Sequence, residues 1–178
     1  MKLSPAYRHR RSIRLKGYDY TDSGAYSVTV CTHNRECLFG EIVDVKMQLN
    51  NFGIIASRCW EEIPTHFDNV SLDVYVVMPN HLHGIIVLKE MPVGEGSPHP
   101  YGQKRTSLGR VVAYFKYQST KHFNEILATP GSPVWQRNYY EHIIRDESDW
   151  NKIREYIGNN PVRWEEDENH PAKMRANT

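Results

Sequence analysis

Alternating apolar and polar residues predict the strands of this chain. Successive side chains of a strand point to opposite faces, so a half-buried strand alternates in polarity and favours β-branched residues. One segment alternates, two are largely apolar runs, and a fourth is rich in apolar and aromatic residues: Ala25–Thr32, Leu72–Val77, His81–Leu88 and Val134–Ile144. The Pro79-Asn80 turn joins two of these strands and predicts a hairpin.

Apolar residues spaced three or four positions apart predict helices between these strands. Three segments are expected to be helical: Met47–Ile63, Ser107–Ile126 and Asp146–Gly158. Pro64 and Pro161 stand where the first and last of them end, and Asp146 is a favourable N-cap. Glu90–Gln103 is rich in Gly and Pro and is expected to be a loop.

The order of these elements predicts an α+β fold. Strand, helix, strand, strand, helix, strand, helix is the order of a ferredoxin-like or RRM-like antiparallel sheet, with helices on one face and an added C-terminal helix. The 178 residues suit a single domain, and no apolar run approaches the roughly 20 residues that span a bilayer. Three cysteines form neither a paired framework nor a metal spacing, which favours a reducing cytoplasm.

The net charge of +1 conceals an uneven distribution. Residues 1–17 and residues 103–124 contain several Lys and Arg and no Asp or Glu. Residues 165–168, in contrast, read EEDE. We therefore expect a basic N-terminal arm at 1–20, a folded domain at 21–164 and an acidic, flexible tail at 165–178. Aromatic residues lie among the basic ones at 114–123, which suits a polyanion with bases to stack on. Solvated helix and tail faces explain the same charges equally well.

The histidines of the sequence His81-Leu82-His83 fall on one face of a predicted strand and could clamp a metal ion. Such pairs also arise by chance in a chain with nine histidines, and two ligands do not complete a site. On the last helix Tyr156 and Asn160 are four residues apart, so an amide oxygen and a phenol share one flank.

A second pair with the same spacing lies on the preceding helix. Tyr114 and Gln118 are also four residues apart. The residues alone leave open which of the two pairs, if either, faces the histidines.

Four sequence blocks resemble one family. They are VVMPNHLHGII at 76–86, FKYQSTK at 115–121, VWQRNYYEHIIRDE at 134–147 and YIGNNPVRW at 156–164. In this order they resemble the REP-associated tyrosine transposases, part of the single-tyrosine HUH transposase superfamily, over roughly residues 24–164. The resemblance implies a ferredoxin-like domain whose last helix carries the catalytic tyrosine.

The resemblance also implies a chemistry. Tyr156 would be the nucleophile, and His81, His83 and Asn160 would hold a divalent cation, Mg²⁺ or Mn²⁺. Single-stranded DNA beside hairpins, in repetitive extragenic palindromes or element ends, would be cleaved through a 5′-phosphotyrosine and rejoined without ATP. The protein would work in the bacterial cytoplasm at the nucleoid, as a monomer or homodimer and away from membranes.

Basic side chains are the candidates for phosphate contacts with this DNA. They are Arg8, Arg10, Arg11, Arg14, Arg110, Lys116 and Lys121. A competing interpretation is a non-catalytic hairpin DNA- or RNA-binding protein of the same fold. A phosphoesterase of small molecules fits less well, because the chain lacks paired His-x-Thr/Ser motifs and shows no carboxylates near the two histidines.

Overall fold

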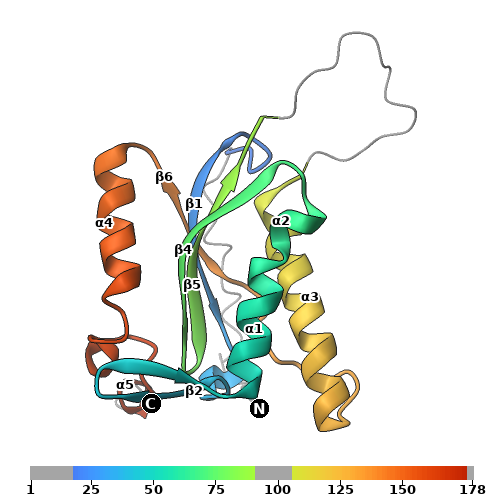
Figure 1. The fold of residues 1–178 in the computed structure, drawn as a ribbon, viewed down its shortest axis with the longest axis vertical. Helices are drawn as coiled ribbons and strands as arrows, with labels where there is room; N and C mark the ends of the chain where they lie inside the picture. Colours follow the sequence, from blue (N-terminus) through green and yellow to red (C-terminus); the bar gives the residue numbers. More distant parts are fainter. Residues whose placement is uncertain (1–17, 91–105, 176–178) are drawn as a thin grey trace, which may run out of the picture.

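The central sheet of the computed structural model is antiparallel, with the strand order β4-β5-β1-β6 (Figure 1). The structure describes residues 18–90 and 106–175. The four strands are β1 (Gly24–Cys31), β4 (Val70–Met78), β5 (His81–Leu88) and β6 (Tyr140–Ile144). This order is that of a ferredoxin-like sheet, so the predicted fold class is confirmed.

Three helices cover one face of the sheet (Figure 1). They are α1 (Asn51–Glu61), α2 (Ile63–His66) and α3 (Leu108–Leu127). The side chains of Asn50 and Ser107 accept hydrogen bonds from the first turns of α1 and α3, which fixes where these helices begin. Trp60 and Phe115 pack edge to face in the main core between these helices and the sheet.

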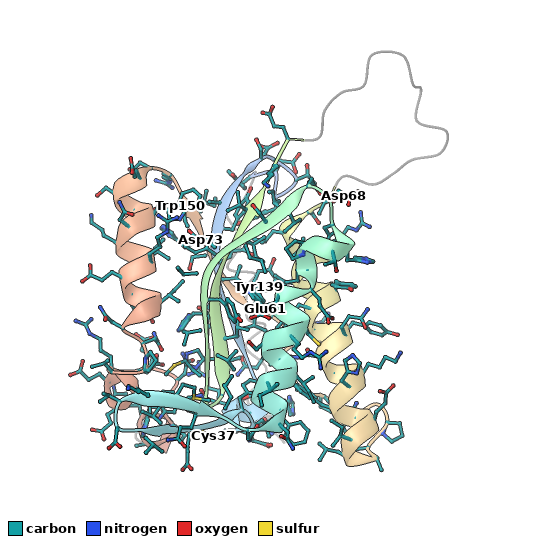
Figure 2. The ribbon with its side chains drawn as sticks, viewed as in Figure 1. Cys37, Glu61, Asp68, Asp73, Tyr139 and Trp150 are labelled. Carbon is teal, nitrogen blue, oxygen red and sulfur yellow. The ribbon has the colours of Figure 1, made fainter. Side chains whose placement is uncertain are left out.

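Helix α4 (Glu147–Gly158) lies on the opposite face, apart from the other long helices (Figure 1). Ile157 packs there with Ile85 of β5 in a second, smaller core. The helix is also tied to β4, because Arg154 Nε donates to Asp73 Oδ2 over 2.7 Å and Trp150 Nε1 donates to the same carboxylate. Figure 2 shows Trp150 and Asp73 lying toward one another between α4 and the sheet.

The Asp73 carboxylate is held in its charged form. Burial raises its pKa, but the hydrogen bonds from Arg154 and Trp150 outweigh burial and lower the pKa below its usual value. A carboxylate bonded to two side chains of α4 fixes the position of that helix on the sheet.

Small elements complete the described chain. They are β2 (Gly40–Val43), β3 (Lys46–Leu49), the 3₁₀ turns η1 (His33–Arg35) and η2 (Trp164–Glu166), and α5 (Pro171–Arg175). Within the described residues, no helix has the length and apolar character needed to cross a membrane.

Two predicted elements differ from the structure at one end. The helix expected from Met47 begins at Asn51, because residues 46–49 pair with 40–43 in the β2–β3 hairpin. The strand expected from Val134 begins at Tyr140. The preceding chain leaves the ladder so that Trp135 enters the main core, where its Nε1 donates to Ser119 Oγ over 2.9 Å.

Candidate metal centre and active site

The two histidines of β5 point toward the face on which α4 lies. His81, His83 and Ile85 alternate along β5 with Leu82 and Ile86, which belong to the main core on the other face. The His81 and His83 rings lie edge to face with their centroids 4.5 Å apart. Both side chains are buried, at 0% and 4% exposure. The shared face expected from strand geometry is therefore present.

Each imidazole is oriented through its Nδ1 atom. His81 Nδ1 lies 2.9 Å from Asn80 Oδ1, and His83 Nδ1 lies 2.7 Å from Thr29 Oγ1 on β1. The Nε2 atoms of both rings are buried and have no hydrogen-bond partner among the described residues. Metal-binding histidines show this arrangement, in which one ring nitrogen is held by a neighbour and the other is left to the ion.

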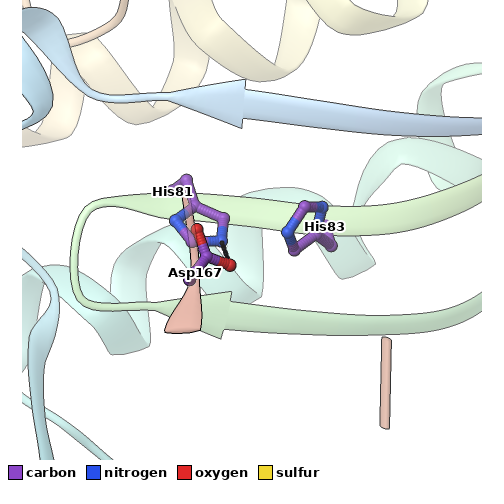
Figure 3. A group of neighbouring side chains, drawn as sticks. All are labelled: His81, His83 and Asp167. Carbon is purple, nitrogen blue, oxygen red and sulfur yellow. Dashed lines mark ion pairs between the residues drawn. The ribbon is translucent and has the colours of Figure 1, made fainter. Parts of the chain in front are cut away.

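Oxygen donors approach the two rings from the C-terminal part of the chain. Asn160, which follows α4, is 2% exposed, and its Oδ1 is a third buried atom without a partner among the described residues. Asp167 Oδ2 lies 3.8 Å from His81 Nε2. Figure 3 shows the carboxylate beside the His81 ring. Ligand atoms of His81, His83 and Asp167 all lie within 4.8 Å of one another.

This set of donors fits a divalent cation. Two neutral imidazole nitrogens, a carboxamide oxygen and a carboxylate oxygen are ligands that Mn²⁺ and related ions accept. Buried polar atoms normally have partners, so several unpartnered ones converging on one place need an explanation, and a bound cation supplies it. Asp167 was not among the ligands predicted from the sequence. The acidic run at 165–168 carried no signal that singled it out.

Burial keeps both imidazoles neutral. It holds the pKa of His81 well below its usual range, and the neighbouring His83 and Arg35 lower it further, while Asn160 acts in the opposite direction. Burial also lowers the pKa of His83 to about 4, although Asp167 opposes this shift. Both rings are therefore in the neutral form that binds metals at ordinary pH.

Tyr156 stands beside the histidines. Its ring centroid lies 5.3 Å from that of His83, and 48% of the residue is exposed, so the phenol is open to a ligand. Partial burial of the side chain raises the pKa of Tyr156, as do the negative charges of Asp167 and Glu168, while Asn160 lowers it. In the cation-free protein the phenol is therefore protonated at neutral pH.

The alternative tyrosine lies elsewhere. Tyr114 stacks on the ring of His66, with 4.0 Å between ring centroids, and packs edge to face on Phe67. These contacts are on the face covered by α1, α2 and α3, so the pair Tyr114 and Gln118 does not meet the histidines. The structure thus brings together Tyr156 and Asn160 with the histidine pair.

An open cleft of about 360 Å³ leads to Tyr156 and His83. Two arginines line it, Arg35 from η1 and Arg163 from the segment after α4. Tyr140 of β6 lines it too, in the same row of the sheet as Thr29 and His83. Sequence reasoning missed these three residues, because none of them belongs to a motif with a metal or nucleophile spacing.

The basic residues predicted to contact DNA lie in different parts of the molecule. Arg8, Arg10, Arg11 and Arg14 lie outside the described residues. Arg110 and Lys121 are exposed on α3, on the face of the sheet opposite the histidines.

Lys116, the third predicted DNA contact on α3, is hydrogen-bonded within the fold. Its Nζ donates to the backbone carbonyls of Gln136 over 2.9 Å and of Asn138 over 3.0 Å, and lies 3.4 Å from that of Arg137. Burial lowers the pKa of Lys116 to about 8. Its ammonium is therefore bonded to the loop before β6.

The acidic segment after residue 164 also differs from the flexible tail that we expected. Through residue 175 it contains η2 and α5, and it packs on the site. Asn169 is 8% exposed, and its carbonyl accepts a 2.7 Å hydrogen bond from Asn80 Nδ2. Arg35 Nη1 donates to the Glu168 carbonyl over 3.0 Å. These contacts place Asp167 beside His81.

Comparisons with known proteins find similar sequences and a similar fold. No protein-family model matches the chain. A Haemophilus influenzae protein of uncharacterised function is 46% identical over 178 residues, covering 94% of this chain and 96% of that protein. A second H. influenzae protein, provisionally named a REP-associated tyrosine transposase, is 27% identical over 153 residues, which are 82% of this chain and 74% of that protein.

A solved REP-associated tyrosine transposase, bound to a REP hairpin, superposes with a TM-score of 0.59. The chain is similar to REP-associated tyrosine transposases in sequence and in fold. The superposition covers 85% of this chain and 74% of the solved one at 20% sequence identity, so it establishes the shared fold. The resemblance expected from the four sequence blocks is confirmed.

Proposed function

We propose that this relative of the REP-associated tyrosine transposases is itself a transposase, which cleaves and rejoins single-stranded DNA beside hairpins. One observation carries the proposal. Tyr156 reaches the cleft next to His83, where the buried, unpartnered atoms His81 Nε2, His83 Nε2 and Asn160 Oδ1 converge. A nucleophile beside a site for a divalent cation is an arrangement that supports metal-assisted phosphoryl transfer.

The proposed cleavage step exchanges one phosphodiester for another. Tyr156 Oη attacks a backbone phosphate, a P–Oη bond forms, and the bond to the 3′ oxygen breaks. The products are a 5′-phosphotyrosine and a free 3′-hydroxyl, which takes up a proton as the phenol loses its own. Because the phosphotyrosyl ester keeps the energy of the cleaved bond, a 3′-hydroxyl can attack it and rejoin strands without ATP.

His81, His83 and Asn160 would hold the cation, and Asp167 is placed to join them. A bound Mg²⁺ or Mn²⁺ would polarise the phosphate and offset its developing charge. The two imidazoles suit Mn²⁺ better than Mg²⁺, which prefers oxygen ligands. Arg35 and Arg163, which line the same cleft, supply positive charge where a phosphate would lie.

The proposed partner is hairpin DNA, as found in repetitive extragenic palindromes or at element ends. A REP hairpin is the ligand of the solved transposase with the similar fold. Arg110 and Lys121 are exposed on α3 and are proposed as phosphate contacts. The N-terminal arginines Arg8, Arg10, Arg11 and Arg14 are proposed as further phosphate contacts. Such a protein would act on the bacterial chromosome, in the cytoplasm. Because one chain carries both Tyr156 and the histidines, we expect cleavage by a monomer, and a homodimer is the alternative.

The test is covalent capture of the DNA. The purified protein is incubated with single-stranded hairpin DNA and Mn²⁺ or Mg²⁺, and we expect an adduct that survives SDS. Tyr156→Phe should abolish the adduct. Tyr140→Phe, which removes another hydroxyl from the same cleft, should retain it and is the matched control.

Two outcomes would count against the proposal. An adduct that persists in Tyr156→Phe would assign the nucleophile to another residue. A wild-type protein that binds the hairpin with Mn²⁺ present but forms no adduct would instead be a non-catalytic hairpin-binding protein of this fold.

Replacing both His81 and His83 by Ala should abolish cleavage and leave hairpin affinity nearly unchanged.

A further inference from the structure

Asn80, at the turn between β4 and β5, is bonded to three separate parts of the chain. It is fully buried. Its Nδ2 donates to the carbonyl of Arg35 over 3.0 Å and to the carbonyl of Asn169 over 2.7 Å. Its Oδ1 lies 2.9 Å from Nδ1 of the adjacent His81. The residue thus joins η1, the start of β5 and the C-terminal segment.

These contacts fix the orientation of the Asn80 carboxamide. The atom facing the Arg35 and Asn169 carbonyls must be the NH₂ group, because a carbonyl oxygen can only accept. The atom facing His81 is then the amide oxygen, which is also only an acceptor. His81 Nδ1 must therefore carry the proton, and in the neutral ring Nε2 carries the lone pair.

This tautomer creates a conflict that a cation resolves. The lone pair of His81 Nε2 has Asp167 Oδ2 only 3.8 Å away, and the carboxylate is an acceptor as well. Two acceptors without a shared proton or ion gain nothing from facing each other in a buried place. A divalent cation within reach of both would satisfy them together.

The same carboxamide positions the carboxylate. Asn80 Nδ2 holds the Asn169 carbonyl, and the Asn169 backbone N–H donates to Asp167 Oδ1 over 2.6 Å. This bond leaves Oδ2 on the side of His81. One side chain therefore sets the tautomer of one ligand and the location of another.

We propose that Asn80 is a positioning residue for the metal centre: it presents His81 Nε2 to a divalent cation and holds the segment that carries Asp167 beside it. The proposal rests on the metal site of the proposed function, but not on DNA cleavage. Asn80 would act through its bonds to His81 and Asn169 and not as a ligand of the cation.

The test compares two variants of Asn80 with a matched control. Asn80→Ala removes every bond of the side chain, whereas Asn80→Asp keeps an acceptor for His81 and loses both donors. Asn50→Ala is the control, because Asn50 also makes three side-chain hydrogen bonds, but at the start of α1 and away from the site. It should cost stability without changing the metal centre.

Three readouts are measured. Long-range ¹H–¹⁵N NMR of the cation-free protein reports which nitrogen of His81 carries the proton. Mn²⁺ affinity is measured by electron paramagnetic resonance, and amide hydrogen exchange follows residues 167–170. We expect Nδ1–H at His81 in the wild type, in Asn50→Ala and in Asn80→Asp, and a mixture of tautomers in Asn80→Ala.

Mn²⁺ affinity should fall about 10–100-fold in Asn80→Ala, the usual effect of removing the partner that orients a metal-bound histidine. Exchange at 167–170 should quicken in both Asn80 variants and stay at the wild-type rate in Asn50→Ala. Any of three results would overturn the proposal. They are a proton on Nε2 of wild-type His81, an Asn80→Ala protein that binds Mn²⁺ as tightly as the wild type, and a wild type that binds no Mn²⁺. A protein that meets these expectations but gives no Tyr156 adduct would refute strand cleavage and leave the role of Asn80 intact.

Discussion

Acid should destabilise the cation-free protein through His83. The residue is 4% exposed, and burial lowers its pKa from 6.5 to about 4. Between pH 4 and pH 6.5 the unfolded chain binds a proton at His83 and the folded protein does not. The stability contributed by the neutral ring is therefore present above pH 6.5 and is lost as the pH falls toward 4. At about 1.36 kcal/mol per pKa unit, the full loss is about 3 kcal/mol, of which about 2 kcal/mol falls between pH 7 and pH 4.5.

The perturbation is His83→Asn, which removes the titrating group and keeps an amide near Thr29. Urea unfolding of the wild type and the variant, with a chelator present, gives the free energy of unfolding at pH 7 and at pH 4.5. The wild type should lose about 2 kcal/mol more than the variant over this interval, since the other acidic groups contribute to both proteins. His122→Asn, at an exposed histidine on α3, controls for the loss of a surface imidazole. Equal pH dependence in the wild type and His83→Asn would refute the reasoning.

Two further predictions test the charges around the site. Lys116→Met should lower the free energy of unfolding by about 1–2 kcal/mol, because backbone carbonyls lose their ammonium partner, and should leave the salt dependence of hairpin binding unchanged. A weaker salt dependence in this variant would show that the ammonium reaches a phosphate after all. The pKa of Tyr156 is raised by burial and then by nearby negative charges, so Glu168→Gln should lower it in the cation-free protein. The measurement is a ¹³C NMR titration of the tyrosine ring carbons, and an unchanged or higher pKa would contradict the assigned cause.

Local periodicity was enough to predict the face that the site occupies. The alternation of side chains along β5 put His81 and His83 on one face, and the four-residue spacing put Tyr156 of α4 and Asn160, just after the helix, on one flank. What the spacing left open was whether α4 covers the histidine face. Ile157 packing on Ile85 answers this, because it turns the flank with the tyrosine toward the metal centre.

Contacts between residues far apart in the chain were not predictable in this way. Asp167 is one of four consecutive acidic residues, and only the folding back of the chain distinguishes it from its neighbours. Arg35 likewise reaches the cleft through the turn after β1. The backbone carbonyls that surround Lys116 were likewise not predictable, because side-chain charge does not indicate which carbonyls lie nearby after folding.

The site lies where several chain reversals meet at one end of the sheet. Asn80 turns β4 into β5, η1 follows the end of β1, and the chain after α4 folds back over both. Strand pairing has ended at these turns, so their backbone carbonyls are free to bind side chains, as the Arg35 and Asn169 carbonyls bind Asn80. Each segment therefore contributes a different group. Strand β5 provides the two imidazoles, the last turn of α4 and the residues just after it provide the phenol and an amide, and the final segment provides a carboxylate. This division explains why the sequence carries the site as separate blocks, each of which is ambiguous until the fold brings them together.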